Sequence, residues 1–231
     1  MAAGKAAATP GRTILIGSNS QLWRTLANDP RLATPVEVSM GHLAAATFEF
    51  RSTDCVWVFS YSRKASENLE LLAGLQARGV AQIRYVSSSS TIVCQVTRCY
   101  EYPRLKAEAE AAVLAIPGGT VLTLGLVFGD PPELPGGDNV ATSFRELADF
   151  MCHPEWPDGS GRRKLLFNRV PRPFSGHLEA MLYRIYDRLL RACGRYPCLL
   201  RPVDLALRCC GYRWYGYVRL SNRLWYSTIS S

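Results

Sequence analysis

Short apolar runs alternate with amphipathic segments along the chain as far as Asp130. The apolar runs, rich in β-branched and aromatic residues, predict buried strands. They lie at Thr13–Ile16, Val36–Val38, Cys55–Phe59, Ile83–Val86 and Thr120–Phe128. The segments between them have helical spacing at about Leu22–Asn28, Ser66–Arg78 and Tyr102–Ala115, with Ser18 or Ser20 expected to cap the first and Gly79 to end the second. This alternation predicts an α/β fold, a Rossmann-like parallel sheet with helices on both faces.

A proline- and glycine-rich segment, Pro131–Gly137, is the clearest boundary in the chain. The pattern beyond it predicts a helix at Thr142–Met151, a loop at His153–Arg163, a strand at Leu165–Phe167 and a helix at His177–Cys193. We therefore expect a disordered N-terminal arm (1–11), a Rossmann-like nucleotide-binding domain (12–130) and a small, mostly helical C-terminal subdomain (131–231).

Polar and glycine-containing segments follow the predicted strands. They are Gly17–Gln21, Ser60–Ser62, Ser87–Ser90 and Gly125–Gly129. Parallel sheets bind ligands in the crevice at the carboxyl ends of their strands. The sequence therefore predicts a ligand site that is formed by these four segments.

A tyrosine and a lysine, Tyr102 and Lys106, lie four residues apart near the start of a predicted helix. This spacing places both side chains on one helix face, one turn apart. A nearby ammonium group lowers the pKa of a phenol because it stabilises the phenolate. Tyr102 could then exchange a proton with a substrate oxygen, and a hydroxyl of Ser87–Ser90 could hold the same oxygen. In such a site a nicotinamide would carry the hydride.

With these motifs the sequence resembles the short-chain dehydrogenase/reductase superfamily, in particular its extended branch, which modifies nucleotide sugars. Tyr85–Val93 (YVSSSSTIV) is similar to the branch's strand that ends in a serine run. Gly125–Gly129 (GLVFG) and Leu165–Ser175 (LLFNRVPRPFS) resemble two later segments of the branch. The resemblance covers most of residues 12–200.

The resemblance implies a set of site residues. Tyr102 would be the acid/base and Lys106 its pKa modulator and a ribose ligand, while Ser89, with Ser88 next to it, would be the catalytic hydroxyl. NAD or NADP would be the cofactor. The residues that would bind it are Gly17, Ser18, Asn19, Ser20, Gln21, Leu22, Ser60 and Lys106.

The sequence departs from the family pattern at the dinucleotide-binding loop. The family has G-x-x-G-x-x-G, whereas this chain keeps only Gly17 and has Ser20 and Trp23 at the other two positions. The second glycine lets the backbone approach the pyrophosphate, and the third allows close helix–strand packing. Trp23 is expected to be a core residue. The family's arginine before the segment at Gly125–Gly129 is missing as well.

Charge is distributed unevenly along the 231 residues, whose net charge is +8. Arg162–Ser231 contains 14 basic and three acidic residues, which give +11, and the preceding residues then total −3. This segment also holds 11 of the 24 aromatic residues. No nucleic-acid-binding module is recognisable, so we do not expect a nucleic-acid partner.

Three explanations for the basic segment stay open. Its arginines are solvated opposite an apolar helix face, or they contact an anionic ligand such as a sugar-nucleotide diphosphate. In the third, Leu199–Tyr226 lies on an anionic membrane surface, because apolar residues, Trp/Tyr and Arg are the composition of an interfacial helix. A homodimer is not excluded.

The cysteines and the apolar content narrow the class of protein. No C-x-x-C pair occurs among the eight cysteines, and the three histidines do not cluster near them, so no metal site is expected. No uncharged apolar run reaches the length of about 18 residues that a membrane-spanning helix needs. We expect reduced thiols in a cytoplasmic protein, at the inner face of the membrane if the third explanation holds.

Two functions from different classes follow. The first is an NAD(P)-dependent enzyme that oxidises, reduces or epimerises a sugar nucleotide in polysaccharide or glycoconjugate biosynthesis. The alternative is a catalytically degenerate Rossmann-fold binding or scaffold protein, which Ser20 and Trp23 favour.

Overall fold

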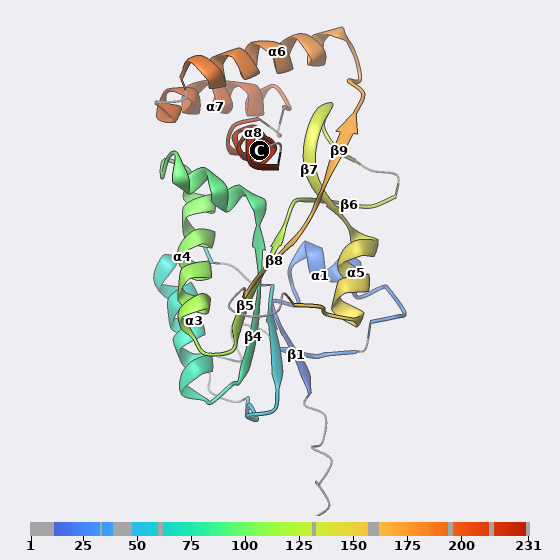
Figure 1. Cartoon of the computed structure of the whole chain (residues 1–231), viewed down its shortest axis with the longest axis vertical. Coiled ribbons are helices and arrows are strands. Elements are labelled where there is room, and N and C mark those ends of the chain that lie inside the picture. The colour runs from blue at the N-terminus through green and yellow to red at the C-terminus, as the bar shows by residue number, and fades with distance from the viewer. Residues whose placement is uncertain are drawn as a thin grey trace, which may run out of the picture.

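A six-stranded parallel sheet forms the centre of the molecule in the computed structural model (Figure 1). The structure describes residues 12–32, 34–38, 48–59, 62–130, 133–156, 162–193, 196–212 and 215–229. The strand order is β2-β1-β3-β4-β5-β8, and every neighbouring pair is parallel. The strands are β1 (Thr13–Ile16), β2 (Val36–Val38), β3 (Cys55–Val58), β4 (Gln82–Ser88), β5 (Gly119–Leu124) and β8 (Arg163–Leu166).

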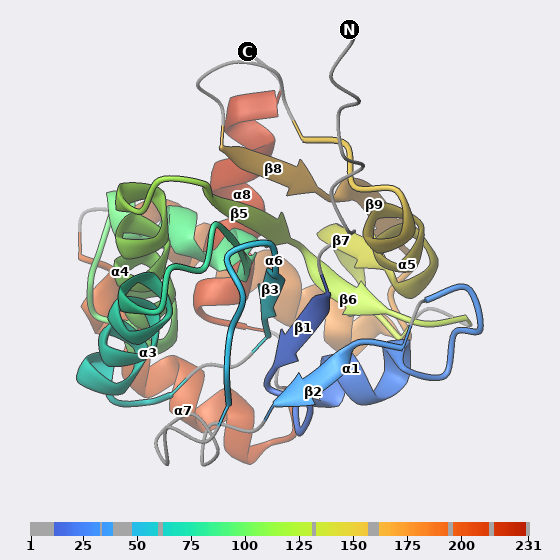
Figure 2. The ribbon, with the colours of Figure 1, turned by 90° about the horizontal axis from the view of Figure 1, so that it is seen from below.

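Helices cover both faces of this sheet, as Figure 2 shows. One face packs on α3 (Ala65–Ala77) and α4 (Glu101–Ala115), and the other on α1 (Gln21–Leu26) and α5 (Phe144–Cys152). The strand side chains alternate between the two cores: Ile14 and Ile16 face α3 and α4, whereas Leu15 faces α1 and α5. Because successive side chains of a strand point to opposite faces, a sheet covered on both sides needs these continuous apolar runs. The predicted fold class is therefore confirmed.

The strand that the sequence predicts at Thr120–Phe128 is in fact two strands. The first, β5, ends at Leu124, and β6 (Leu126–Phe128) belongs to a second sheet of order β6-β7-β9. Gly125 sits at the break, where its N–H donates to Thr142 Oγ1 at 2.9 Å. A Cβ at Gly125 would lie 2.5 Å from the Val140 carbonyl oxygen, so only glycine allows the two backbones to approach this closely.

The predicted helix at Thr142–Met151 begins two residues later than expected. Residues Gly137–Ser143 form β7, which pairs in parallel with β6 and antiparallel with β9 (Asn168–Arg172). Ser143 then caps α5 in a capping box with Glu146, and this reciprocal pair of hydrogen bonds fixes where the helix starts. The strand β7 was not predicted.

The C-terminal part consists of four helices, as far as the structure describes it, packed at the carboxyl end of the sheet (Figure 1). They are α6 (His177–Ala192), the 3₁₀ helix η2 (Pro197–Leu200), α7 (Arg201–Cys209) and α8 (Tyr217–Ile229). A third apolar core joins these helices to the 3₁₀ helix η1 (Ser89–Gln95) and includes Ile92, Val93, Tyr186, Leu190, Leu200 and Leu220. The basic segment is thus a packed layer on the sheet's carboxyl end.

The division of the chain at Asp130 stays a prediction, but the main sheet crosses it, because β8 pairs with β5. All eight cysteines are among the described residues and carry free thiols. No helix among the described residues is both long and apolar enough to cross a membrane.

Candidate active site

The serine run forms a tight turn at the carboxyl end of β4. Ser88 ends the strand and caps η1: its Oγ accepts from the Ser90 N–H at 3.2 Å and from the Ser90 hydroxyl at 3.0 Å. Ser89 and Ser90 are buried, and Ser88 is half-buried. The cap explains why the strand stops here, and it holds the hydroxyl groups of Ser88 and Ser90 against each other.

Tyr102 lies in the first turn of α4 and faces the same cleft as the serines. The cleft has a volume of about 250 Å³. The ring of Tyr102 stacks on that of Tyr217 from α8, with centroids 5.9 Å apart and an angle of 27° between the planes. The residues that line the cleft are Ser88, Ser89, Ser90, Tyr102, Gly125, Leu126, Val127, Tyr217, Val218, Ser221 and Asn222. The structure thus brings three of the predicted catalytic side chains, Ser88, Ser89 and Tyr102, to one cavity.

Lys106 lies one turn further along α4 and is only 5% exposed. Its Nζ donates to the carbonyl oxygen of Val86 at 2.9 Å and lies 4.7 Å from the centre of the Tyr85 ring. Burial lowers the pKa of Lys106 to about 8, and the nearby Glu110 carboxylate opposes this shift. Lys106 does not line the cleft, so its charge would act on Tyr102 from within the protein.

Replacing Lys106 with methionine is expected to remove one source of pH dependence in stability. The pKa of Lys106 falls from 10.5 to about 8 on folding, so the unfolded chain binds more protons between these pH values. The lysine therefore costs stability below about pH 8, and the cost disappears as the pH rises towards 10.5. Relative to Lys106→Met, the wild type should gain about 2 to 3 kcal/mol over this window.

Urea unfolding of both proteins, followed by tryptophan fluorescence between pH 7 and about pH 10, checks this prediction. The comparison matters because burial raises the pKa of Cys55 and Cys94 in both proteins, so the contribution of these thiols cancels in the difference. If the two curves of stability against pH run parallel, the pKa of Lys106 is not lowered in the native state.

The last helix of the chain forms one wall of the cleft. The carbonyl oxygen of Ser89 accepts from Trp225 Nε1 at 2.8 Å and from Ser221 Oγ at 3.0 Å. These two contacts hold α8 against the serine turn. Neither residue was a predicted site residue, because their partner is more than 130 residues away in sequence and the sequence carries no local signal for the pairing.

The predicted dinucleotide-binding turn follows β1. Gly17 has a φ of 98°, a conformation that favours glycine, and the half-buried Ser18 and the exposed Asn19 form a turn before α1. Ser20 caps α1 by accepting from the Trp23 N–H at 3.1 Å. The N–H groups of Gln21 and Leu22 begin the helix and so have no acceptor within it. This arrangement fits a bound pyrophosphate, although α1 has only six residues.

Trp23 is a core residue, as predicted, and it is accommodated by the short α1. Its ring packs 5.8 Å from that of Phe59, and its Nε1 donates to Glu37 Oε1 at 2.8 Å. Glu37 lies on β2, exposed, twenty residues after Gly17. An acidic residue at about this distance binds the adenosine ribose in dinucleotide-binding folds, so the spacing was a signal for Glu37 that the sequence interpretation missed. The predicted site residue Ser60 lies outside the described residues.

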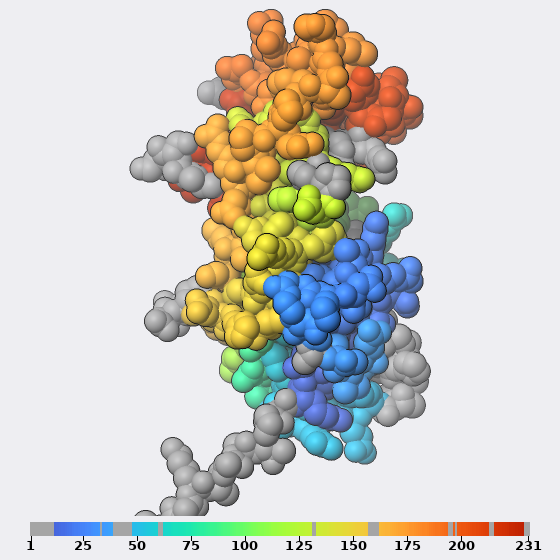
Figure 3. All heavy atoms as spheres, turned by 90° about the vertical axis from the view of Figure 1, so that its right-hand side faces the viewer, coloured from blue at the N-terminus to red at the C-terminus, as the bar shows by residue number. Residues whose placement is uncertain are grey.

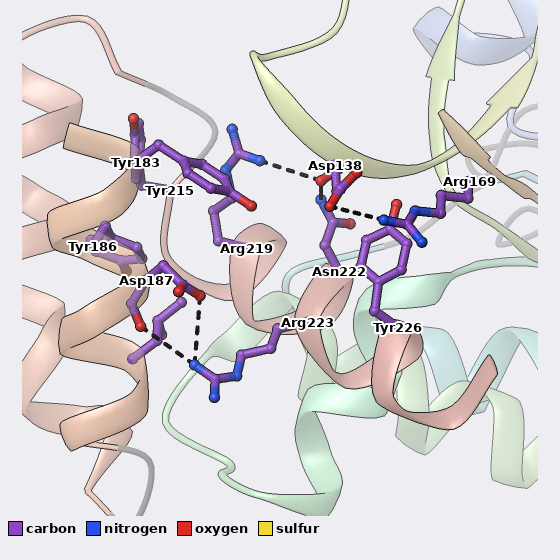
Figure 4. Close-up of a pocket in the computed structure, with 11 residues that line it drawn as sticks. Asp138, Arg169, Tyr183, Tyr186, Asp187, Tyr215, Arg219, Asn222, Arg223 and Tyr226 are labelled. Carbon is purple, nitrogen blue, oxygen red and sulfur yellow. Dashed lines mark hydrogen bonds and ion pairs between the residues drawn. The ribbon is translucent and has the colours of Figure 1, made fainter. Parts of the chain in front are cut away.

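A second cavity, of about 260 Å³, lies between α6, α8 and the sheet of β7 and β9 (Figure 4). Tyrosine and arginine side chains dominate it. Arg169 pairs with Asp138 at 3.2 Å, and Arg223 lies 3.6 Å from Asp187. The cavity lining is Asp138, Arg169, Tyr183, Tyr186, Asp187, Leu190, Tyr215, Arg219, Asn222, Arg223 and Tyr226. Asn222 of α8 lines both cavities.

Arg219 is the most deeply placed cation of this second cavity, at 5% exposed. Its guanidinium donates to the carbonyl oxygens of Gly136, at 2.6 Å, and Asp138, at 3.4 Å. It lies 4.7 Å from the ring of Tyr183 and 5.6 Å from that of Tyr215. Burial lowers the pKa of Arg219, and the polar groups around it oppose that shift. With three arginines and two carboxylates, the cavity keeps an excess of positive charge next to aromatic rings, which suits an anionic ligand with a planar group.

No family model and no curated protein matches the sequence. Among solved structures, the chain is similar to dTDP-4-dehydrorhamnose reductase from Bacillus anthracis in complex with NADP, with 12% identity and a TM-score of 0.51 over 79% of this chain and 83% of that one. Vestitone reductase from alfalfa, Medicago sativa, gives 14% identity and a TM-score of 0.49 over 81% and 82% of the two chains. The dTDP-glucose 4,6-dehydratase of Streptomyces venezuelae, solved with NAD, gives 10% and 0.49 over 75% and 80%.

The likeness to the Bacillus anthracis reductase shows the fold. The expected architecture, a parallel α/β sheet with a helical C-terminal part, is thereby confirmed.

Proposed function

We propose that the protein is an NAD(P)-dependent enzyme that oxidises, reduces or epimerises a sugar nucleotide. One observation carries the proposal: Ser88, Ser89 and Tyr102 line a single cleft at the carboxyl edge of the sheet, and Lys106 is buried one helix turn from Tyr102. A hydroxyl pair for a substrate oxygen, a phenol for proton exchange and a buried ammonium are the groups that such a reaction needs.

Each residue has a separate task in this reaction. Tyr102 gives a proton to, or takes one from, the reacting oxygen, and Ser88 or Ser89 holds that oxygen. Lys106 stabilises the phenolate form of Tyr102 through its positive charge. The turn at Gly17–Leu22 would hold the pyrophosphate of the cofactor and Glu37 a ribose hydroxyl. The nicotinamide, when bound, supplies or accepts the hydride.

The second cavity supports a nucleotide-linked substrate. Arg169 and Arg223 are exposed enough to reach a diphosphate, and the tyrosines offer faces on which a base can stack. Asn222 lines both cavities, so a substrate anchored in the second would have its sugar towards the first. The activity and bound NADP of the similar Bacillus anthracis reductase agree with this substrate class and cofactor.

Replacing Arg223 with glutamine is expected to weaken the binding of UDP or dTDP by about ten- to a hundredfold, the usual worth of one charge-assisted hydrogen bond. Isothermal titration calorimetry with the free nucleoside diphosphate measures this. Arg24→Gln, on the exposed face of α1, is the matched control. Equal affinity in wild type and Arg223→Gln would remove the second cavity from substrate binding.

The reaction itself is tested by incubating the protein with NAD or NADP, each in oxidised and in reduced form, and a panel of UDP- and dTDP-sugars. Products are analysed by chromatography and mass spectrometry, because an epimerase or dehydratase returns its cofactor unchanged. A new sugar nucleotide that forms only with enzyme and cofactor together supports the proposal. A panel left unconverted with both cofactors would count against turnover of this substrate class.

A second candidate function is a binding or scaffold protein that keeps the fold without turnover. The observation that favours it is at the dinucleotide turn, where Trp23 engages one oxygen of the Glu37 carboxylate and Ser20 occupies the N–H of Trp23. The Glu37 carboxylate and the Trp23 N–H therefore already form hydrogen bonds within the protein, which leaves them less available to a cofactor. This candidate predicts nucleoside diphosphate binding without nicotinamide binding.

A further inference from the structure

Helices α6 and α7 lie at one end of the molecule (Figures 1 and 3), and both expose large apolar side chains. Leu178, Met181 and Ile185 of α6 recur at helical spacing, and Leu199 of η2 and Leu205 of α7 are exposed as well. Their exposed fractions are 57% for Leu178, 50% for Met181, 45% for Ile185, 62% for Leu199 and 66% for Leu205. Exposed leucines that occur singly are ordinary, but a stripe on neighbouring helices marks an interaction surface.

Exposed arginines accompany these apolar residues on the same two helices. Arg184, Arg188 and Arg191 are exposed on α6, and Arg201 and Arg208 are exposed on α7. We call the five arginines, together with the five apolar residues above, the outer face.

The acidic residues of the two helices, all of whose positions are described, point away from the outer face. Glu179 accepts from the N–H groups of Gly136 and Ser175, and Asp204 is buried between two tyrosines. Asp187 lies towards α8 and lines the second cavity, although it also reaches Arg191 at 2.5 Å. Arg191 thus pairs with Asp187, and Arg208 interacts with the Asp204 carboxylate, so the outer face combines apolar side chains with a net positive charge.

The positive charge of the outer face favours some binding partners over others. A second copy of this chain would bring five arginines against five, which repel each other. A nucleic acid could pair with the arginines, but it would leave the exposed leucines, methionine and isoleucine without an apolar partner. Anionic lipid satisfies both, because the arginines reach the headgroups while the apolar side chains enter the acyl boundary.

We infer that the outer face binds anionic phospholipid, so that α6 and α7 lie flat on a membrane surface. The sequence placed a membrane contact at Leu199–Tyr226, but α8 is packed inside, with Leu220 at 5% exposed and in the third core. The contact therefore moves to α6, η2 and α7. In this orientation the sheet and both cavities extend away from the lipid.

Co-sedimentation with vesicles tests the inference, using the full chain and needing no turnover. We expect binding to vesicles of mixed phosphatidylglycerol and phosphatidylcholine, and at least tenfold weaker binding to phosphatidylcholine alone. Arg184→Glu/Arg188→Glu should weaken binding to the anionic vesicles by at least tenfold, because each arginine near such a surface is worth about a fivefold change in affinity. The same loss is expected on raising the salt concentration.

Two further variants separate lipid insertion from plain charge attraction. Arg24→Glu/Arg145→Glu makes the same charge change on exposed residues outside the outer face and should bind like wild type. Met181→Trp should show a blue-shifted fluorescence on adding anionic vesicles, because its ring would enter the apolar boundary. Equal loss in both double variants, no shift at position 181, or no binding of the wild type would overturn the inference. If the protein does not bind vesicles but still converts a sugar nucleotide, the membrane inference is wrong and the proposed function stands.

Discussion

Replacing Tyr102 with phenylalanine is expected to lower the turnover number by about 100- to 10,000-fold, the usual contribution of a positioned acid/base group. The variant removes one oxygen atom and keeps the ring that stacks on Tyr217. Binding of NAD(P) and of the nucleoside diphosphate should stay within about twofold of wild type, because neither contact needs the phenol. Steady-state kinetics on the converted sugar nucleotide, with calorimetry for each ligand, measures both effects.

Tyr100→Phe is the matched control for this prediction. Tyr100 is two residues earlier and also loses one hydroxyl, but that hydroxyl donates to Asp204 and does not line the cleft. Its turnover should stay close to that of the wild type under conditions where the variant is folded. If Tyr102→Phe keeps more than about a tenth of the activity, Tyr102 is not the acid/base.

Replacing Asp204 with alanine is expected to lower the free energy of unfolding by about 2 to 4 kcal/mol. The carboxylate of Asp204 accepts from the hydroxyls of Tyr100, at 3.0 Å, and of Tyr186, and so joins α4, α6 and α7. Burial raises the pKa of Asp204, and the two tyrosine donors oppose this. The alanine variant leaves the buried phenol of Tyr186 and the half-buried phenol of Tyr100 without this acceptor, and opens a gap beside Gly216.

Urea unfolding followed by tryptophan fluorescence measures the loss. Asp204→Asn keeps one carbonyl oxygen as acceptor and should lose less than the alanine variant. Asp187→Ala, a half-buried carboxylate paired mainly with exposed arginines, should cost no more than about 1 kcal/mol. Equal losses at Asp204 and Asp187 would show that the tyrosine network does not hold the C-terminal helices.

The order of strands and helices could be predicted from the sequence because each element has a strong local signal. The apolar run at Thr13–Ile16 and the glycine after Arg78 are examples, and both hold in the structure. The break at Gly125 and the strand β7 were not predictable in this way. They depend on the Thr142 hydroxyl and on pairing with β9, which are contacts between distant residues.

The candidate site likewise has a part that could be predicted from the sequence and a part that could not. Ser88, Ser89, Tyr102 and Lys106 could be predicted because they follow one strand and begin one helix. The wall formed by α8 could not, since Trp225 and Ser221 reach the Ser89 carbonyl from the far end of the chain. Arg219 and the tyrosines around it were visible in the sequence only as an excess of basic and aromatic residues. Their convergence on one cavity depends on how α6 and α8 pack.

The central claim is that the turn after β1 and the cleft at Ser88 and Tyr102 together bind a nicotinamide cofactor. The most direct measurement is a calorimetric titration of the purified protein with NADH and with NADPH. The proposed function predicts saturable binding of at least one of them, with one site per chain and a dissociation constant well below millimolar. No binding of either cofactor at millimolar concentration would contradict it, and binding of a nucleoside diphosphate alone would favour the scaffold protein instead.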